Sequence, residues 1–126
     1  ARNGVVVHAM RMDLLGAMRH GCIDVLIFNP PYVPTSADEL EEAIESRDIA
    51  AAWAGGPRGR LVLDRLLPSL SALLSARGVF YLLGVRENDP DELATILAQS
   101  GLHATIVGER RAQNERLFVL RAARAS

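Results

Sequence analysis

The run Ile-Asp-Val-Leu-Ile-Phe at residues 23–28 ends abruptly at Asn29-Pro30-Pro31, and this junction strongly constrains the fold. The run is rich in β-branched and aromatic side chains, which predicts a buried strand over Ile23–Phe28. Proline has no backbone N–H to give to a central ladder, so the strand has to end here. Open α/β sheets bind ligands beyond the carboxyl ends of their strands. The segment after this strand is therefore the first place to look for a functional site.

Strands and helices alternate along the rest of the chain. Leucines recur at helical spacing from Arg60 and predict a helix that ends near Gly78. A second helix is predicted to start with Asp89 as its N-cap and to end at Gly101. The other predicted elements are a strand at 4–8, a turn or short helix at 13–19, a helix at 37–46, and strands at 79–85, 103–109 and 117–120. This order predicts a single α/β domain over residues 1–126, with an antiparallel hairpin at the far edge of its sheet.

Composition excludes several classes of protein. The chain has 126 residues, of which 49% are hydrophobic, so it can bury a core and is not a disordered tail. No apolar run approaches the roughly 18 residues that a membrane span needs. The net charge of -1 argues against a dedicated nucleic-acid binder, which normally carries a basic surface. The single cysteine, Cys22, excludes an internal disulfide and fits a reducing cytoplasm or nucleus.

The tetrapeptide Asn29-Pro30-Pro31-Tyr32 carries groups suited to methylating a planar nitrogen. The lone pair of an amide or amino nitrogen is delocalised, and a site that accepts both N–H hydrogens directs it toward an electrophile. The side-chain oxygen of Asn29 can accept one hydrogen and the backbone carbonyl of Pro30 the other, while the two prolines hold that carbonyl rigid. Tyr32 can stack on the flat target group. The alternative is a turn without a catalytic role, because asparagine before two prolines also ends strands outside active sites.

The segment Asp24–Val33 resembles motif IV of the amino-methyltransferases that use S-adenosyl-L-methionine. Its Asn-Pro-Pro-Tyr motif is shared with enzymes that methylate DNA and RNA. The segment Ala51-Ala52-Trp53-Ala54-Gly55-Gly56 narrows the resemblance to the HemK-like protein-glutamine methyltransferases, in the eukaryotic and archaeal branch that modifies the translation termination factor. Further similar segments are Gly59-Arg60, Asp64-Arg65, Arg86–Pro90 and Arg110–Leu120, so the resemblance covers essentially the whole chain.

The resemblance implies a Rossmann-like class I methyltransferase sheet and a specific reaction. That reaction is methyl transfer from S-adenosyl-L-methionine to the side-chain amide nitrogen of glutamine, in the Gly-Gly-Gln segment of a release factor. It implies that Asn29, Pro30, Pro31 and Tyr32 form the catalytic motif. Of these, Asn29, Pro30 and Tyr32 would bind the target amide. Asn29 would also lie against the methionine part of the cofactor.

The resemblance also implies further cofactor, substrate and partner contacts. Asp13, followed by Leu14, matches the acidic residue that binds the adenine amino group of the cofactor; the alternative is a capping or surface aspartate. Trp53 is either a core residue or a wall of the substrate groove. In this branch a small zinc-ribbon activator subunit covers an apolar surface near the first strand, which implies a heterodimer formed around Val5–Val7. The implied location is the cytoplasm, with the nucleus as a second one.

Parts of the family pattern are missing from these residues. No Gly-x-Gly-x-Gly loop follows a predicted strand, and Gly55–Arg60 is no substitute because no strand precedes it. The resemblance thus implies a sheet truncated at its amino-terminal side, with about half of the cofactor pocket absent. A non-catalytic interaction module is therefore an alternative function. Lysine or N6-adenine methylation is an alternative within the same chemistry, although a nucleic-acid substrate predicts a basic groove.

The remaining titratable residues suggest no metal site. His8, His20 and His103 lack metal-ligand spacing, and Cys22 is predicted to be a small buried hydrophobe. The acidic stretch Asp38–Asp48 predicts either a solvated helix face or a docking surface for a basic substrate segment.

Overall fold

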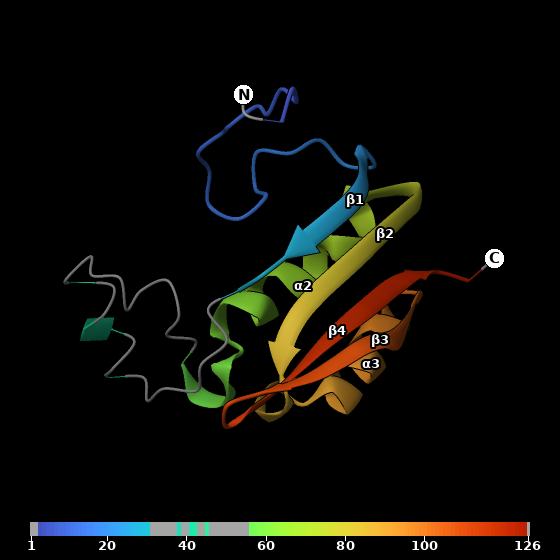
Figure 1. Cartoon of the computed structure of the whole chain (residues 1–126). Helices are drawn as coiled ribbons and strands as arrows, with labels where there is room; N and C mark the ends of the chain where they lie inside the picture. Colours follow the sequence, from blue (N-terminus) through green and yellow to red (C-terminus); the bar gives the residue numbers. More distant parts are fainter. Residues whose placement is uncertain (1–2, 31–37, 39–40, 43–44, 46–55, 126) are drawn as a thin grey trace.

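The computed structural model describes residues 3–30, 38, 41–42, 45 and 56–125. Four strands form one mixed sheet in the order β1-β2-β4-β3 (Figure 1). They are β1 (Ile23–Phe28), β2 (Leu74–Val85), β3 (Leu102–Ala112) and β4 (Glu115–Arg124). β1 runs parallel to β2, whereas β4 runs antiparallel to both β2 and β3. The predicted α/β sheet with an antiparallel hairpin at its far edge is confirmed.

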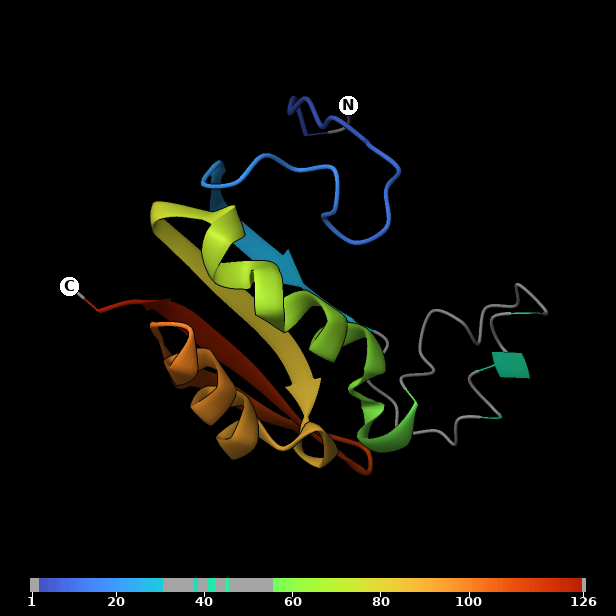
Figure 2. The ribbon, with the colours of Figure 1, turned by 180° about the vertical axis from the view of Figure 1, so that it is seen from behind.

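Two helices, α2 (Leu61–Leu73) and α3 (Pro90–Gln99), cover the same face of the sheet (Figure 2). The leucines at helical spacing form the buried stripe of α2, as predicted. The core between helices and sheet includes Leu63, Leu66, Leu70, Phe80, Leu82, Leu93, Leu97, Phe118 and Leu120. Full burial of each such side chain contributes about 1.5–3 kcal/mol to the free energy of unfolding. Packing between the two helices and the sheet is therefore the main source of stability in the described fold.

The ends of α3 follow the sequence prediction. The Asp89 side chain accepts a hydrogen bond from the Glu92 backbone N–H at 3.2 Å, and Pro90 occupies the first helical position. Gly101 follows the helix with a φ of 80°, a left-handed conformation that glycine adopts without strain. This N-cap places the first turn of α3 beside the end of β2.

The predicted end of α2 near Gly78 is wrong, because the helix stops at Leu73 and the chain enters β2 at Leu74. Gly78 lies within β2 instead. A Cβ at this position would come within 2.7 Å of the Ile23 carbonyl oxygen. The glycine therefore permits the close approach of β1 to β2, next to the register shift between Ile23 and Val25.

The predicted strand over residues 4–8 is also wrong. The backbone from Val5 to Arg11 forms no ladder with the described part of the sheet, and Val5, Val6 and Val7 are 57%, 79% and 82% exposed. A β-branched run becomes a strand only when a neighbouring strand supplies its hydrogen bonds, and the described chain offers none at this place. The predicted turn at 13–19 is confirmed by backbone hydrogen bonds from Gly16 to Asp13 and from Met18 to Leu15.

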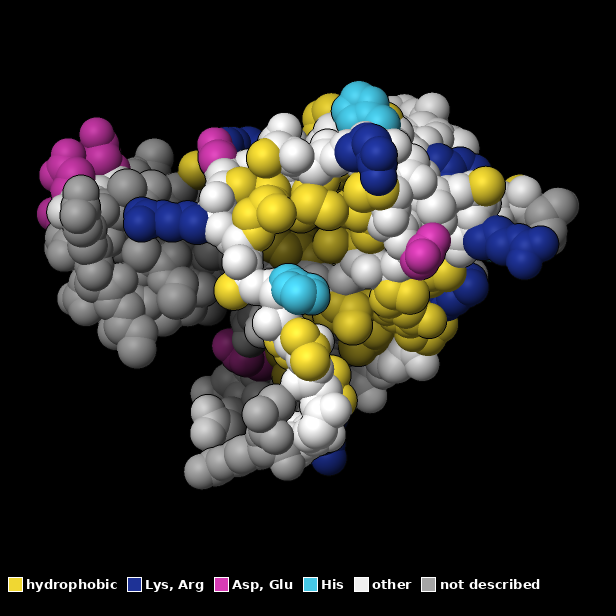
Figure 3. Space-filling view, turned by 90° about the horizontal axis from the view of Figure 1, so that it is seen from above, with side chains coloured by type: hydrophobic (Ala, Val, Ile, Leu, Met, Phe, Trp, Pro, Cys, Tyr) yellow, Lys and Arg dark blue, Asp and Glu magenta, His cyan; other side chains and the backbone are white. Residues whose placement is uncertain are grey.

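Apolar side chains remain exposed away from the two helices. β1 is an edge strand, with Val25 60% and Ile27 74% exposed on the face opposite the core. Figure 3 looks onto the side where the amino-terminal segment lies and shows hydrophobic side chains gathered at the surface. Patches of this kind commonly mark interaction surfaces. Among the described helices, none is long and apolar enough to cross a bilayer.

Candidate active site

The candidate site begins where β1 ends. Asn29 and Pro30 directly follow Phe28, which pairs with Leu82 of the parallel strand β2. The carboxyl ends of both strands therefore lie at the same edge of the sheet, where α/β folds bind ligands. Asn29 is exposed and Pro30 is buried, so the amide is accessible while the backbone after it is anchored.

Three predicted site residues, Pro31, Tyr32 and Trp53, lie outside the described residues. Most of the predicted helix at 37–46 does as well. Within the acidic stretch, the described residues Asp38, Glu41, Glu42 and Glu45 are helical and exposed. Their exposure agrees with both a solvated face and a docking surface.

Asn88 is a structural determinant of this edge that the sequence analysis did not identify. Its side chain is 2% exposed and lies in the 3-10 helix η3 (Arg86–Asn88), between β2 and α3. Its Oδ1 accepts a hydrogen bond from the Val85 backbone N–H at 2.8 Å, and its Nδ2 donates to the Arg58 carbonyl at 2.9 Å. The asparagine thus joins the end of β2 to the 3-10 helix η2 (Pro57–Gly59), which is remote in sequence.

Gly84 makes room for this bridge. A Cβ at Gly84 would lie 2.6 Å from Cζ of Phe118 and 3.0 Å from Oδ1 of Asn88. A side chain there would displace the ring of the core phenylalanine and the asparagine together. The sequence analysis included Asn88 only within the segment Arg86–Pro90 of the family resemblance and assigned it no role.

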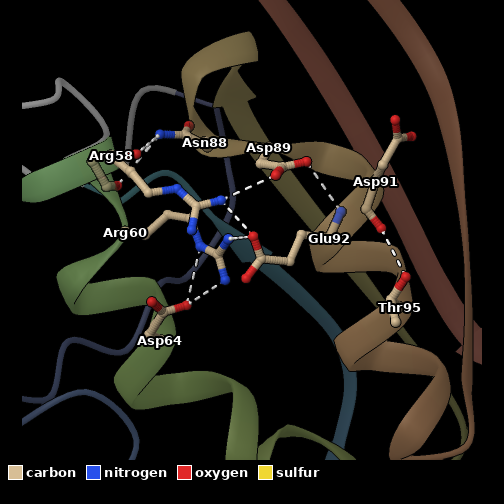
Figure 4. A network of polar contacts seen from close by, with 9 residues as sticks. Arg58, Arg60, Asp64, Asn88, Asp89, Asp91, Glu92 and Thr95 are labelled. Carbon is tan, nitrogen blue, oxygen red and sulfur yellow. Dashed lines mark hydrogen bonds and ion pairs between the residues drawn. The ribbon is translucent and has the colours of Figure 1, made fainter.

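A second link crosses the same edge through charged side chains (Figure 4). The Arg60 side chain, only 4% exposed, donates to Oδ1 of Asp64 from Nη2 at 2.9 Å and lies 3.3 Å from Oε2 of Glu92 through Nη1. Glu92 also pairs with Arg58, which in turn reaches Asp89 at 3.0 Å. A buried guanidinium needs such partners, since removing them leaves an uncompensated charge. The network ties the start of α2 to the start of α3.

The same contacts shift the pKa of both exposed partners. The hydrogen bond from Arg58 is the largest effect and lowers the pKa of the Glu92 carboxyl below its ordinary value; desolvation opposes it, and the charges of Arg60 and Arg58 add to the lowering. The hydrogen bond and charge of Glu92 raise the pKa of Arg58. Both shifts favour the charged forms, so the ion pair is retained at neutral pH.

We expect Glu92→Gln to reduce stability at neutral pH and to have less effect in acid. Because the folded-state pKa of Glu92 is lowered, its contribution is fully present above the unfolded value near 4.5 and is lost as the pH falls through the folded value. Urea unfolding at about pH 6 and about pH 3 measures this difference. Glu115→Gln, outside the network, serves as the control. A difference between wild type and Glu92→Gln that stays constant with pH would contradict the prediction.

Asp13, for which the resemblance implies a contact with the adenine of the cofactor, lies in the turn before β1. Its Oδ2 accepts a hydrogen bond from Nη2 of Arg65 on α2 at 2.8 Å, and its side chain is 77% exposed. The next residue, Leu14, has a φ of 51° and packs against the core together with Leu15 and Met18. The turn is thus anchored by its leucines while the carboxylate faces outward. The described contacts of Asp13 lead to α2 and not to Asn29.

Two further expectations concern side chains elsewhere. Cys22 is exposed, so the prediction of a buried hydrophobe is wrong; it lies in the loop just before β1, ahead of the first buried position at Ile23. Within the described part of the chain, no group of three histidine, cysteine or carboxylate side chains is placed to hold a metal ion.

The chain is similar to known methyltransferases. It is 48% identical to the mouse methyltransferase HEMK2 over 101 residues, which are 80% of this chain and 45% of that protein. It is 39% identical to the eRF1 methyltransferase catalytic subunit mtq2 of Schizosaccharomyces pombe over 119 residues, which are 94% of this chain and 51% of that protein. The chain therefore spans about half the length of these relatives. No family model matches it.

A solved structure shares the fold. The E. cuniculi Mtq2-Trm112 complex, described as responsible for methylation of the translation termination factor eRF1, contains a chain that superposes with a TM-score of 0.72. The match has 29% sequence identity and covers 92% of this chain and 60% of that chain. The predicted class of fold, a Rossmann-like methyltransferase sheet, is confirmed by this similarity.

Proposed function

Because this chain is related in sequence and fold to the HemK-like protein-glutamine methyltransferases, of which it spans about half the length, we propose that it contributes the target-binding edge of such an enzyme. The reaction is methyl transfer from S-adenosyl-L-methionine to the side-chain amide nitrogen of a glutamine in a release factor. The observation that carries the proposal is the placement of Asn29 and Pro30 at the carboxyl end of a strand of the sheet.

The exposed amide of Asn29 suits the recognition of another amide. Its oxygen can accept one N–H of the target glutamine, and the Pro30 carbonyl can accept the other. Two acceptors aimed at the same nitrogen orient its lone pair without a proton being removed first. Burial of Pro30 limits the movement of this backbone, so part of the orientation is set before the target binds. Pro31, Tyr32 and Trp53 complete the proposed target site.

Asp13 and Leu14 are proposed to hold the adenosine part of the cofactor. The chemistry of the site fits, because Oδ1 of Asp13 makes no hydrogen bond to a described residue and the carboxylate is exposed, while the half-buried Leu14 offers an apolar neighbour. S-adenosyl-L-methionine supplies the activated methyl group when bound. Asn29 is proposed to border its methionine end.

We expect Asp13→Asn to weaken binding of S-adenosyl-L-methionine about tenfold, because the charged acceptor for the adenine amino group is lost. Loss of the exposed pair with Arg65 has little effect on stability. Isothermal titration of the native protein measures the affinity. Asp24→Asn is the matched control, since Asp24 is also exposed and accepts one side-chain hydrogen bond, from Ser75 at 2.7 Å. If the two variants bound S-adenosyl-L-methionine with equal affinity, Asp13 would not be a cofactor ligand.

Two protein partners are proposed, on the basis of the Mtq2-Trm112 complex and of the family resemblance. A release factor is the substrate, and a small zinc-ribbon activator forms a heterodimer with the methyltransferase. The exposed residues Val5, Val6, Val7 and Met10 provide an apolar surface for this activator. Because translation factors are cytoplasmic, we propose a cytoplasmic location for the enzyme. We also assign the chain to a single methyltransferase domain.

The reaction is tested by incubating the native protein and its activator with S-adenosyl-L-methionine and three substrates. These are a release factor, a lysine-rich histone tail and an adenine-containing DNA duplex. Mass spectrometry should locate the methyl group on the glutamine of the Gly-Gly-Gln segment. Methylation confined to lysine or adenine would overturn the proposed substrate. Failure to bind the cofactor at all would favour a non-catalytic interaction module.

A further inference from the structure

An open groove of about 830 Å³ lies between the tip of the β3–β4 hairpin and the junction of η3 with α3. Phe118 and Ile106 contribute apolar surface from the sheet, and Pro90 contributes it from the start of α3. Arg86 lines the junction side, while Arg111 and Arg116 line the hairpin side. The groove therefore has polar and apolar surface in similar amounts, and guanidinium groups border it from two directions.

Arg111 and Arg116 stand directly opposite each other in the antiparallel register. Strand alternation places Arg116 on the same face as Phe118, two residues along β4, and therefore Arg111 as well. Like charges directly opposite each other destabilise a hairpin. Within the described chain neither arginine joins an ion pair, and Arg86 does not either. A bound anion would relieve the repulsion that the hairpin carries.

The other charges of the groove narrow the kind of anion. Four carboxylates also line it, on Glu87, Asp89, Asp91 and Glu109, together with Arg110 and with Arg58, which pairs with Asp89. Figure 4 shows the Asp91 carboxylate pointing away from the Arg58–Glu92 pair. Carboxylates spaced among the arginines repel a continuous phosphate backbone, which carries a charge at every step. A peptide can instead place single carboxylates against the arginines and apolar side chains against the apolar part of the lining, near Pro90 and Ile106. Arginine suits such contacts because its planar fork binds a carboxylate with two hydrogen bonds.

We propose that this groove docks an acidic peptide segment of a protein partner, in which carboxylates alternate with apolar side chains. Val85 at the end of β2 pairs with Leu117, so the hairpin tip extends beyond the carboxyl ends of β1 and β2. The groove therefore lies at the same end of the sheet as Asn29 but is built from other residues. Docking here does not require methyl transfer, and the inference goes beyond the proposed function.

The test is fluorescence anisotropy of the native protein with a labelled peptide of roughly twelve residues in which aspartate and leucine alternate. A matched asparagine–leucine peptide and a uridine oligonucleotide of similar length are the comparison probes. We expect the acidic peptide to bind at least about tenfold more tightly than the neutral one, and its affinity to fall as salt rises from about 50 to 300 mM. Equal binding of both peptides, or tighter binding of the oligonucleotide, would overturn the proposal.

Charge reversal at the hairpin distinguishes an effect on peptide binding from an effect on the stability of the fold. Arg111→Glu and Arg116→Glu should each weaken the acidic peptide about tenfold or more. Arg77→Glu makes the same change of charge at an exposed position in the amino-terminal half of β2, and it should leave the affinity within about twofold.

Arg111→Glu also places opposite charges across the hairpin, so the melting temperature should rise by about 1–5 °C while binding falls. Weaker binding accompanied by a lower melting temperature in both hairpin variants would show a structural role instead. Unchanged binding in both variants would exclude the groove as the docking site.

Discussion

Replacing Asn29 with alanine is expected to lower the rate of glutamine methylation by about 10²–10³-fold, the usual cost of removing one preorganised polar group from an active site. The side-chain oxygen of Asn29 is the proposed acceptor for one N–H of the target amide. Without it the nitrogen lone pair is no longer directed toward the methyl donor. Because Asn29 is exposed and follows β1, the substitution removes the proposed hydrogen-bond acceptor without opening a cavity in the core. Single-turnover transfer of a labelled methyl group to a release factor measures the effect.

The control for this experiment is Asn3→Ala, an exposed asparagine in the amino-terminal segment, which should retain the wild-type rate. Asn29→Gln is informative as well, because it keeps the amide but moves its oxygen by one methylene and should lose most of the activity. Unfolding by urea should be the same for all three variants. An Asn29→Ala enzyme that keeps a rate near that of wild type would exclude the proposed site.

Replacing Asn88 with alanine is expected to destabilise the fold by about 2–4 kcal/mol, since each buried group that loses its hydrogen bond costs about 1–3 kcal/mol. The Val85 N–H and the Arg58 carbonyl both lose the partner that they have in the native structure. The link between η2 and the end of β2 is lost with them. The urea midpoint should fall while the slope of unfolding free energy against urea stays constant.

Two further variants make the Asn88 prediction specific. Asn114→Ala removes an exposed asparagine from the hairpin turn, and its effect should stay within about 0.5 kcal/mol. Asn88→Asp keeps an acceptor for the Val85 N–H but replaces the Nδ2 donor with a buried charge, so it should also destabilise the protein. If Asn88→Ala and Asn114→Ala unfolded at the same urea concentration, the bridge would not contribute as argued.

Local patterns were sufficient for the elements whose determinants are close in sequence. The cap of α3 depends on Asp89 and Glu92, three residues apart, and the buried stripe of α2 depends on leucine spacing. The end of β1 before Asn29-Pro30 depends on the chemistry of proline. Each of these features is decided within one or two turns of chain, so the sequence predicts it directly.

The failed predictions concern features that need a distant partner. Val5–Val7 have the composition of a strand but no described neighbouring strand to pair with. Gly78 was predicted to end a helix, whereas its lack of a side chain permits the close approach of β1. The buried Arg60 could not be distinguished from a surface arginine, because its ligands include Glu92, which lies on another helix.

By itself the sequence determined the class of fold, the boundaries of α3, the hairpin, and the position of Asn29-Pro30 at the end of a strand. Only the tertiary structure decided that Asn88 joins η2 to β2, that Arg60 is buried between two helices, and that Arg111 faces Arg116 beside an open groove. The physical reason is the sequence separation of the residues that form each feature. Caps, stripes and strand ends arise from neighbouring residues, whereas burial of a charge, a bridging hydrogen bond and a cross-strand repulsion exist only after remote segments have packed together.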